Sequence, residues 1–236
     1  MKSEEQKHFD RIAKNYQKAS GTWEMLYEQI EERINSLVTD QVVLDIGNGG
    51  RFAYDLSLPS QIIVTDISAD MLFSINDPNI IKIVSDARNM HEIENNSVDV
   101  IIFVLVLHHI NGNNIHQSIE TLEGVLSEAR SKLRPGGCLV VAEALLSPML
   151  FKLQCFLFQL TRSFLHLFGI SMIFFFTQDL LAKRIAKVFQ IEPRDIETSS
   201  LSIKGWLDPL GGSFPGLIKI PVAIQPWIFR LMIATR

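Results

Sequence analysis

Short apolar runs alternate with polar, helix-compatible stretches between residues 42 and 143. Runs rich in β-branched residues and apolar on successive positions are typical of parallel strands that are buried on both faces and joined by crossover helices. Five such strands are predicted, at Val42–Leu44, Ile62–Val64, Ile80–Val84, Val100–Val104 and Cys138–Ala142. The pattern indicates an α/β fold with a doubly wound, mostly parallel sheet.

Helical periodicity appears around these strands. Trp23–Leu37 repeats apolar residues every three or four positions, which predicts a helix that covers the sheet. Ile115–Leu133 predicts a second helix, ended by the turn Arg134-Pro135-Gly136-Gly137. A third is expected from Thr177, a suitable cap, to Phe189. Two terminal strands should complete a seven-stranded sheet, the last at Ile228–Thr235 after a loop rich in Pro and Gly, and an edge pair can be antiparallel.

Residues 145–176 form an apolar insertion after the fifth strand, dominated by Leu, Phe, Ile and Met. Pro148 can start a helix there and Gly169 can end it. A membrane-spanning helix is disfavoured because Lys152, Arg162 and Gly169 interrupt the stretch of about 20 apolar residues it needs. A lid over a substrate, a dimer surface and an interfacial membrane helix remain open, beside ordinary core packing. The membrane helix is least favoured because such a helix usually has a polar face rich in Lys and Arg, and the polar stripe here offers only Lys152 and Arg162.

Composition narrows the class of protein. The 236 residues carry a net charge of −4 with Lys and Arg scattered, which argues against nucleic acid as a partner. The two cysteines, Cys138 and Cys155, lie in apolar stretches and suggest neither disulfides nor a thiolate metal site. Residues 1–8 are too charged for a secretory signal, so a cytoplasmic protein is expected.

A glycine-rich turn follows the first predicted strand, with Asp45 at the strand end and Gly47-Asn48-Gly49-Gly50 after it. Glycines let the backbone approach a ligand closely at the carboxyl edge of a parallel sheet. Asp66 ends the second strand, about twenty residues on, where a carboxylate can accept hydrogen bonds from ribose hydroxyls. The dinucleotide fingerprint would need glycine at position 52, which is Phe52. The turn therefore favours a nucleoside ligand without a pyrophosphate.

Six motifs in chain order resemble those of class I S-adenosylmethionine-dependent methyltransferases, and together they cover nearly the whole chain. They are a leading helix at Phe9–Tyr16, a first motif at Leu44–Gly49, a ribose-binding strand end at Thr65–Leu72, an adenine-binding corner at Ser85–Ala87, a fourth-strand motif at Asn96–Ile110, and a turn before the fifth strand at Leu133–Gly137. The resemblance implies a Rossmann-like methyltransferase fold and S-adenosylmethionine as cofactor.

The resemblance also implies roles at matching positions. Asp45 and the carbonyls around Gly47 would hold the methionine ammonium, and Asp66 the ribose. Asp86 would accept the adenine amino group and Ala87 would offer its amide. The full set of implied cofactor residues is Tyr16, Asp45, Gly47, Asn48, Gly49, Asp66, Ile67, Asp86, Ala87 and Phe103.

The chain departs from the family at one position of the first motif, where Arg51 replaces a third glycine. Its side chain either reaches the carboxylate of the ligand or points to solvent, and the second arrangement is favoured.

Two adjacent histidines follow the fourth strand, His108 and His109, and they are the catalytic candidates. A histidine with a pKa near neutrality suits removal of a proton from a hydroxyl acceptor. The alternative, which is slightly favoured, is that the pair only shapes the loop, and at most one of them should face the acceptor. Glu143, at the end of the fifth strand, is a weaker candidate base, and no cluster of metal ligands stands out, so no metal is predicted.

The chain is expected to be one methyltransferase domain over residues 1–236. Its parts would be an N-terminal helical cover at 1–40, a cofactor-binding core at 41–143, the insertion or lid at 145–176, and the last helix and terminal strands at 177–236. The predicted function is methyl transfer to a small hydrophobic acceptor, at a hydroxyl or carboxylate oxygen of a secondary metabolite or lipid-like compound. A homodimer through the insertion is one option, and a catalytically inactive cofactor-binding partner subunit is the alternative function.

Overall fold

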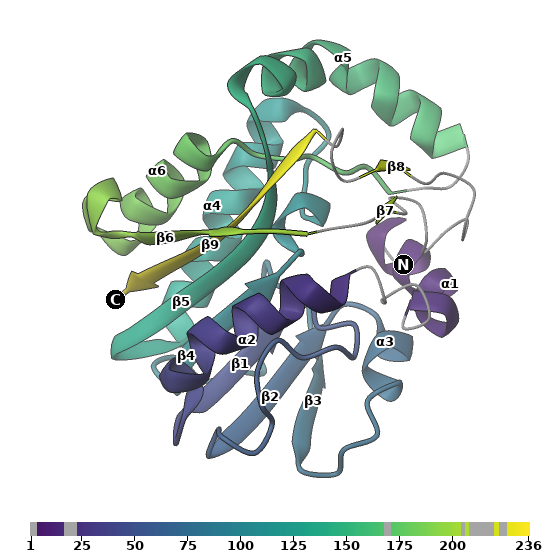
Figure 1. Ribbon diagram of the computed structural model, residues 1–236. Coiled ribbons are helices and arrows are strands. Elements are labelled where there is room, and N and C mark those ends of the chain that lie inside the picture. The colour runs from purple at the N-terminus through teal and green to yellow at the C-terminus, as the bar shows by residue number, and fades with distance from the viewer. Residues whose placement is uncertain (1–3, 17–22, 168–170, 204–205, 208–219, 222–225) are drawn as a thin grey trace.

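Figure 1 shows the computed structural model, a twisted sheet with helices on both faces. The structure describes residues 4–16, 23–167, 171–203, 206–207, 220–221 and 226–236. Its helices are α1 (Glu4–Tyr16), α2 (Glu24–Val38), α3 (Ala69–Phe73), α4 (Ile115–Lys132), α5 (Pro148–Leu167) and α6 (Gln178–Phe189), with short 3-10 turns at Leu107–His109 and Pro193–Asp195. Its strands are β1 (Val42–Ile46), β2 (Gln61–Asp66), β3 (Ile80–Val84), β4 (Val98–Val104), β5 (Leu133–Leu146), β6 (Glu197–Leu201), β7 (Trp206–Leu207), β8 (Ile220–Pro221) and β9 (Trp227–Thr235).

Seven strands form the main sheet in the order β3-β2-β1-β4-β5-β9-β6, and β7 pairs with β8 separately. β9 runs antiparallel to both of its neighbours, and the β1 to β5 ladders are parallel. The order reverses between β1 and β4, and ligands of open α/β sheets bind at such a switch point, outside the carboxyl ends of the strands. The predicted seven-stranded, mostly parallel fold is confirmed.

Two hydrophobic clusters lie on the opposite faces of the sheet. On one face α4 and α6 contribute fully buried residues such as Leu122 and Leu181, and α5 adds Phe158. On the other face α2 contributes Leu26 and Ile30. The 3.6-residue periodicity seen in the sequence thus corresponds to the buried stripe of each covering helix.

The expected turn at residues 134–137 is a strand in the structure. α4 ends at Lys132, and β5 begins at once, with Leu133 opposite Val98 of β4. Gly136 adopts a φ of +83°, and its amide donates to the carbonyl of Arg236, while the Arg236 amide donates to Gly137. Proline does end the helix, but the glycine lets the chain bulge and keep its sheet pairing.

The apolar insertion begins with α5, at the top of Figure 1. The predicted start at Pro148 is correct, and Gly169 lies outside the described residues. None of the described helices is both long enough and apolar enough to cross a bilayer.

Candidate functional site

The turn after β1 requires glycine at its first position. Gly47 has a φ of +72°, in the left-handed region, and a Cβ atom there would lie 2.6 Å from Cγ1 of Val106. Any side chain would therefore be strained by the backbone and would collide with the segment after β4. Gly50 also has a positive φ, +91°.

Asp45 and Asn48 form the inner frame of this turn. Nδ2 of Asn48 donates to Oδ2 of Asp45 at 2.7 Å and to the carbonyl of Arg51 at 3.1 Å, and Oδ1 of Asn48 accepts from the Gly50 amide at 2.7 Å. Burial raises the pKa of Asp45 to about 7, although the hydrogen bond from Asn48 opposes the shift. Both polar ends of Asn48 are thus used within the turn, so this side chain shapes the loop that follows Asp45.

Arg51 takes neither of the two predicted positions, at the carboxylate of the ligand or in solvent. Its guanidinium lies over the ring of Tyr27, 4.4 Å from the centroid, on α2. The contact is a cation–π interaction that fastens the turn to the covering helix. The residue in place of the third glycine therefore has a structural partner that sequence reasoning did not find.

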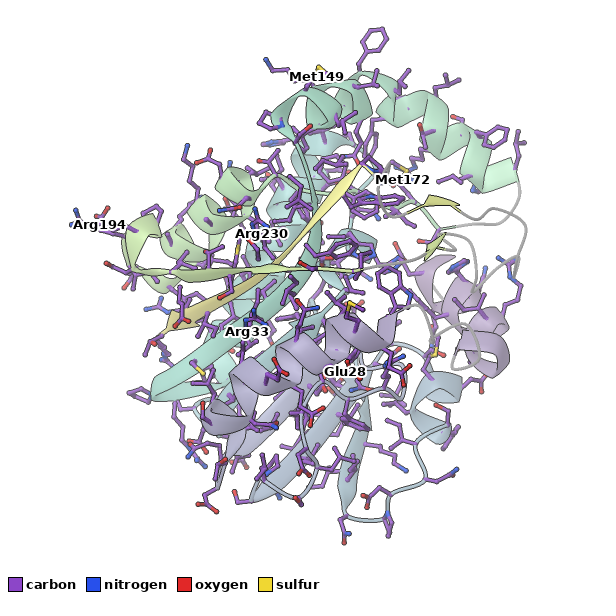
Figure 2. The ribbon with its side chains drawn as sticks, viewed as in Figure 1. Glu28, Arg33, Met149, Met172, Arg194 and Arg230 are labelled. Atoms are coloured by element: carbon purple, nitrogen blue, oxygen red, sulfur yellow. The ribbon has the colours of Figure 1, made fainter. Side chains whose placement is uncertain are left out.

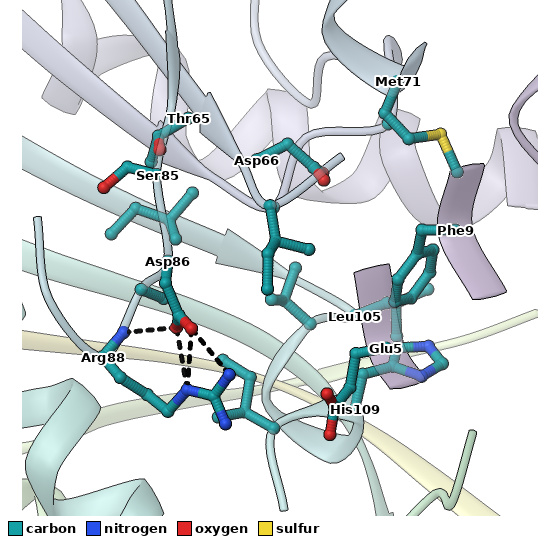
Figure 3. A pocket seen from close by; sticks show the side chains of 17 residues that line it. Glu5, Phe9, Thr65, Asp66, Met71, Ser85, Asp86, Arg88, Leu105 and His109 are labelled. Atoms are coloured by element: carbon teal, nitrogen blue, oxygen red, sulfur yellow. Dashed lines mark hydrogen bonds and ion pairs between the residues drawn. The ribbon is translucent and has the colours of Figure 1, made fainter. Parts of the chain in front are cut away.

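A cavity of about 730 Å³, partly open to solvent, lies at the carboxyl ends of β1, β2 and β4. Seven of the predicted site residues line it: Gly47, Gly49, Asp66, Ile67, Asp86, Ala87 and His109. Figure 3 shows Asp66 and Asp86 on one side of this cofactor cavity and Phe9 of α1 on the other. Phe9, Met71 and Leu105 were missed as lining residues because only the fold brings α1, α3 and the loop after β4 together.

Asp66 is the buried carboxylate of the cofactor cavity, with 8% exposure. The Ser68 amide donates to its Oδ1 at 2.8 Å, and no side chain of the described residues donates to it. Burial raises its pKa to about 7, and the nearby negative charge of Asp10 adds to the shift. Ser68 also donates to Asp10 at 2.6 Å, which ties α1 to the start of α3. A carboxylate buried this way gains from a ligand that offers hydroxyl donors.

Asp86 is not alone at its corner of the cavity. Arg88 donates to both carboxylate oxygens, at distances between 2.6 and 3.0 Å. The hydrogen bond to Asp86 raises the pKa of Arg88, and the charge of Glu5 contributes less. Figure 3 shows Glu5 of α1 and Arg88 at the same rim. The acidic side chain predicted to meet adenine is thus half of an ion pair that the sequence did not reveal.

His109 lies in the wall of the cavity, edge-on to Phe9 at a centroid distance of 5.0 Å. Its Nδ1 atom is buried with no hydrogen-bond partner among the described residues. Burial holds the pKa of His109 well below 6.5, and His108 and His8 add to the shift. The ring is therefore neutral near pH 7 and acts as a mainly apolar wall.

His108 is held by a carboxylate. Its Nδ1 lies 2.6 Å from Oε1 of Glu143, which is 1% exposed. Glu143 also accepts from the amides of Leu107 and Ala144, each at 2.9 Å. Because an ionised carboxylate only accepts, this network assigns the hydrogen of the neutral ring to Nδ1 and the lone pair to Nε2. The described residues offer no hydrogen bond to Nε2, and the side chain keeps 10% exposure.

One face of the His108 ring packs against Phe175. We call His108, Phe175 and Trp227 together the aromatic wall. Phe175 stacks on His108 with centroids 5.1 Å apart and planes at 22°, and Trp227 lies 5.6 Å from Phe175. Gln154 of α5 holds Phe175 by donating to its carbonyl at 2.8 Å and accepting from its amide at 3.0 Å. The insertion thus positions the ring that packs on the histidine.

Five predicted site residues remain: Asp45 and Asn48, which are buried and bonded to each other within the turn, and Phe103, His108 and Tyr16. Phe103 is fully buried in the core beneath β4, so it does not meet a ligand. His108 lies behind His109 rather than in the lining, and the side chain of Tyr16 is outside the described residues. Within the described residues, no group of three or more His, Cys, Asp or Glu gathers as a metal site.

The donor set fits the cofactor that the motifs imply. In the lining, Asp66 can accept hydrogen bonds from a diol, the glycine turn allows close backbone approach, and Ile67 supplies an apolar face.

Comparisons with known proteins agree with this reading. Residues 44–141 match the family model described as a methyltransferase domain. A search of curated proteins finds no match. A chain of the Haloferax volcanii complex that contains the Trm112 methyltransferase activator superposes with a TM-score of 0.67 at 14% identity, covering 98% of this chain and 96% of that one.

Two further solved structures have the same fold. An S-adenosylmethionine-dependent methyltransferase from Thermotoga maritima has a TM-score of 0.62 at 17% identity, with 97% and 98% of the two chains covered. The Burkholderia thailandensis 1,6-didemethyltoxoflavin-N1-methyltransferase, with S-adenosylhomocysteine bound, has a TM-score of 0.58 at 12% identity, with 94% and 84% covered. The match over residues 44–141 shows a methyltransferase domain that uses S-adenosylmethionine as its cofactor, and nearly the whole chain shares the fold of solved methyltransferases.

Proposed function

We propose that the chain methylates an oxygen atom, a hydroxyl or carboxylate, of a small hydrophobic acceptor such as a secondary metabolite or lipid-like compound, in a biosynthetic reaction. The observation that carries this proposal is the buried His108–Glu143 pair next to the cofactor cavity. Of the two oxygen acceptors the pair favours the hydroxyl, since an ionised carboxylate has no proton to lose.

His108 is the proposed base. Nε2 takes the hydroxyl proton as the oxygen–methyl bond forms and the sulfur–methyl bond breaks, and sulfur keeps the bonding electrons. The bound cofactor supplies an electrophilic methyl group on a positively charged sulfur. Glu143 holds the ring in the tautomer that leaves Nε2 free and stabilises the imidazolium that forms. The hydrogen bonds that Glu143 accepts from the amides of Leu107 and Ala144 hold its carboxylate in place against the ring.

The surroundings of the base favour an apolar acceptor. Phe175 covers one face of His108, and the neutral His109 with Phe9 separates it from the polar rim of the cavity. Such walls exclude water from the reacting atoms, and methyl transfer depends mainly on positioning and water exclusion. We therefore assign the acceptor to the side of His109 that faces the aromatic wall.

An inactive cofactor-binding subunit is the competing function, and its sequence support was Arg51 in place of a glycine. Arg51 packs on Tyr27, while Gly47 and Gly50 supply the left-handed positions of the turn. The substitution thus gives no physical reason to expect a damaged cofactor site.

Production of S-adenosylhomocysteine with a panel of apolar hydroxyl compounds tests the proposal. His108→Ala should lower kcat by about 10²- to 10⁴-fold, the usual contribution of a positioned base, while His109→Ala serves as the neighbouring control with a smaller effect. Activity that survives in both variants would remove the histidine base. Cofactor binding in calorimetry without turnover of any compound would favour the inactive subunit.

A further inference from the structure

α5 carries six large apolar side chains on its outer surface. They are exposed between 51% and 85%: Met149, Leu153, Phe156, Leu160, Phe164 and Leu167. At 100° per residue they fall within a sector of about 80°, so they form one straight stripe along a helix about 30 Å long. Figure 2 shows Met149 on α5, on the side that faces away from the body of the protein. The opposite surface of the helix holds Phe158 in the core and Gln154 on Phe175.

The order of residues in this outer stripe is nearly symmetric. Met149 and Leu167 lie equally far from position 158, and so do Phe156 and Leu160. The midpoint of Leu153 and Phe164 lies half a residue away, at 158.5. A twofold axis through the middle of α5 would therefore place every apolar residue of one copy opposite an apolar residue of the other. A twofold interface needs this property, because each residue pairing occurs twice.

From this symmetry we infer that α5 is the contact of a homodimer in which the two outer stripes pack antiparallel. The two copies of Leu153 then face the two copies of Phe164, and Phe156 faces Leu160 at the centre. The inference does not depend on the acceptor or on the base.

Charge on α5 is compatible with a second copy. The helix has no acidic residue, and Lys152 is its exposed charged residue, because Arg162 is partly buried and donates to Asn113. In the antiparallel arrangement the two Lys152 side chains lie about 18 Å apart along the axis, beyond the range of strong repulsion at physiological salt. A membrane surface is a poorer match, because anionic lipid would meet one exposed lysine on a chain with a net charge of −4.

The area of the outer stripe is sufficient for a dimer. At roughly 150 Å² for each large apolar side chain, about two-thirds exposed, one copy offers on the order of 600 Å². Two copies then bury on the order of 1,200 Å², the lower end of specific and stable interfaces. The patch on one copy, on the order of 600 Å², is already as large as a monomer usually exposes.

Sedimentation of the full chain between about 1 and 100 µM, without detergent, tests the dimer. The wild type should sediment as a dimer, and the double variant Phe156→Glu/Leu160→Glu should weaken dimerisation at least 100-fold. Phe73→Glu is the matched control, because Phe73 is 77% exposed on α3, far from α5, and that variant should stay dimeric. Calorimetry with S-adenosylhomocysteine should give the same affinity for all three chains, which shows that the variants are folded.

Disulfide trapping tests the antiparallel arrangement in a Cys155→Ser background. A mixture of Leu153→Cys chains and Phe164→Cys chains should form a cross-linked dimer with copper phenanthroline, whereas either chain alone should not, because identical residues would lie about 16 Å apart. A wild type that is monomeric at 100 µM overturns the inference, and so does a glutamate variant that stays dimeric. Capture of monomers by lipid vesicles, or cross-linking of Leu153→Cys with itself, overturns it as well.

Discussion

The cofactor cavity and the aromatic wall lie side by side but are built in different ways. The cavity takes its groups from strand ends and the turns after them, as with Gly47, Asp66 and Asp86. The aromatic wall depends on side chains that support one another from distant parts of the chain, from Glu143 to His108, Phe175 and Gln154. Backbone geometry thus fixes the cofactor site, whereas the acceptor side can be changed by one side chain at a time.

The largest expected effect comes from breaking the support of His108. Glu143→Gln keeps the size of the side chain but offers the ring an amide in place of a carboxylate, which removes the charge that stabilises an imidazolium. We expect kcat to fall about 10³-fold with little change in the Kd of the cofactor. The pH profile of kcat should also move to lower pH, because the histidine loses the anion that favours its protonated form and the neutral base then persists at lower pH.

A merely structural role for Glu143 would give another result. The variant would then lower thermal stability and cofactor affinity together, and the pH profile of the remaining activity would keep its shape. Glu92→Gln, which alters an exposed glutamate bonded to Ser85, is the matched control and should leave the pH profile unchanged.

The contrast between the two regions explains what could be predicted from sequence. Strand ends are readable because β-branched runs precede them, so Asp66, Gly47 and Ala87 were placed at the cavity. Phe103 was predicted at the cavity, but successive residues of a strand point to opposite faces of the sheet. Its ring lies on the face covered by α4, inside the core. The Gln154–Phe175 contact and the Arg51–Tyr27 contact join residues 21 and 24 positions apart, and no local pattern announces such pairs.

The cofactor cavity can be tested through its buried carboxylates. Burial raises the pKa of Asp66 to about 7 in the folded chain, so the ionised form that accepts ribose hydroxyls increases as pH rises through that value. Adenosine has no group that titrates near neutrality, so its Kd should tighten about tenfold between pH 5.5 and 7.5. Asp66→Asn should bind adenosine more weakly and lose this slope, and Asp70→Asn on the exposed side of α3 should behave as the wild type.

The free energy of unfolding should fall as pH rises, whereas the affinity for adenosine should increase. A carboxyl group whose pKa is raised on folding stabilises the native state below its unfolded pKa, near 4, and this contribution is lost as pH rises through about 7. Without ligand, Asp66→Asn should therefore gain in free energy of unfolding relative to the wild type as pH rises from 5 to 7.5. An equal difference at both pH values would show that Asp66 is not buried in its charged form.

The smallest effect is expected where α5 meets the aromatic wall. Gln154→Leu removes both hydrogen bonds to the backbone of Phe175 and leaves its amide and carbonyl without those partners, which costs about 1–3 kcal/mol of stability. Because Phe175 then holds its stack on His108 less firmly, KM for the acceptor should rise about fivefold while the Kd of the cofactor stays constant. Gln159→Leu is the matched control, since Gln159 lies on the same helix and bonds only the exposed carbonyl of Asn113. If both variants change KM equally, α5 acts through its general stability rather than through Phe175, and the aromatic wall is not the acceptor side of the site.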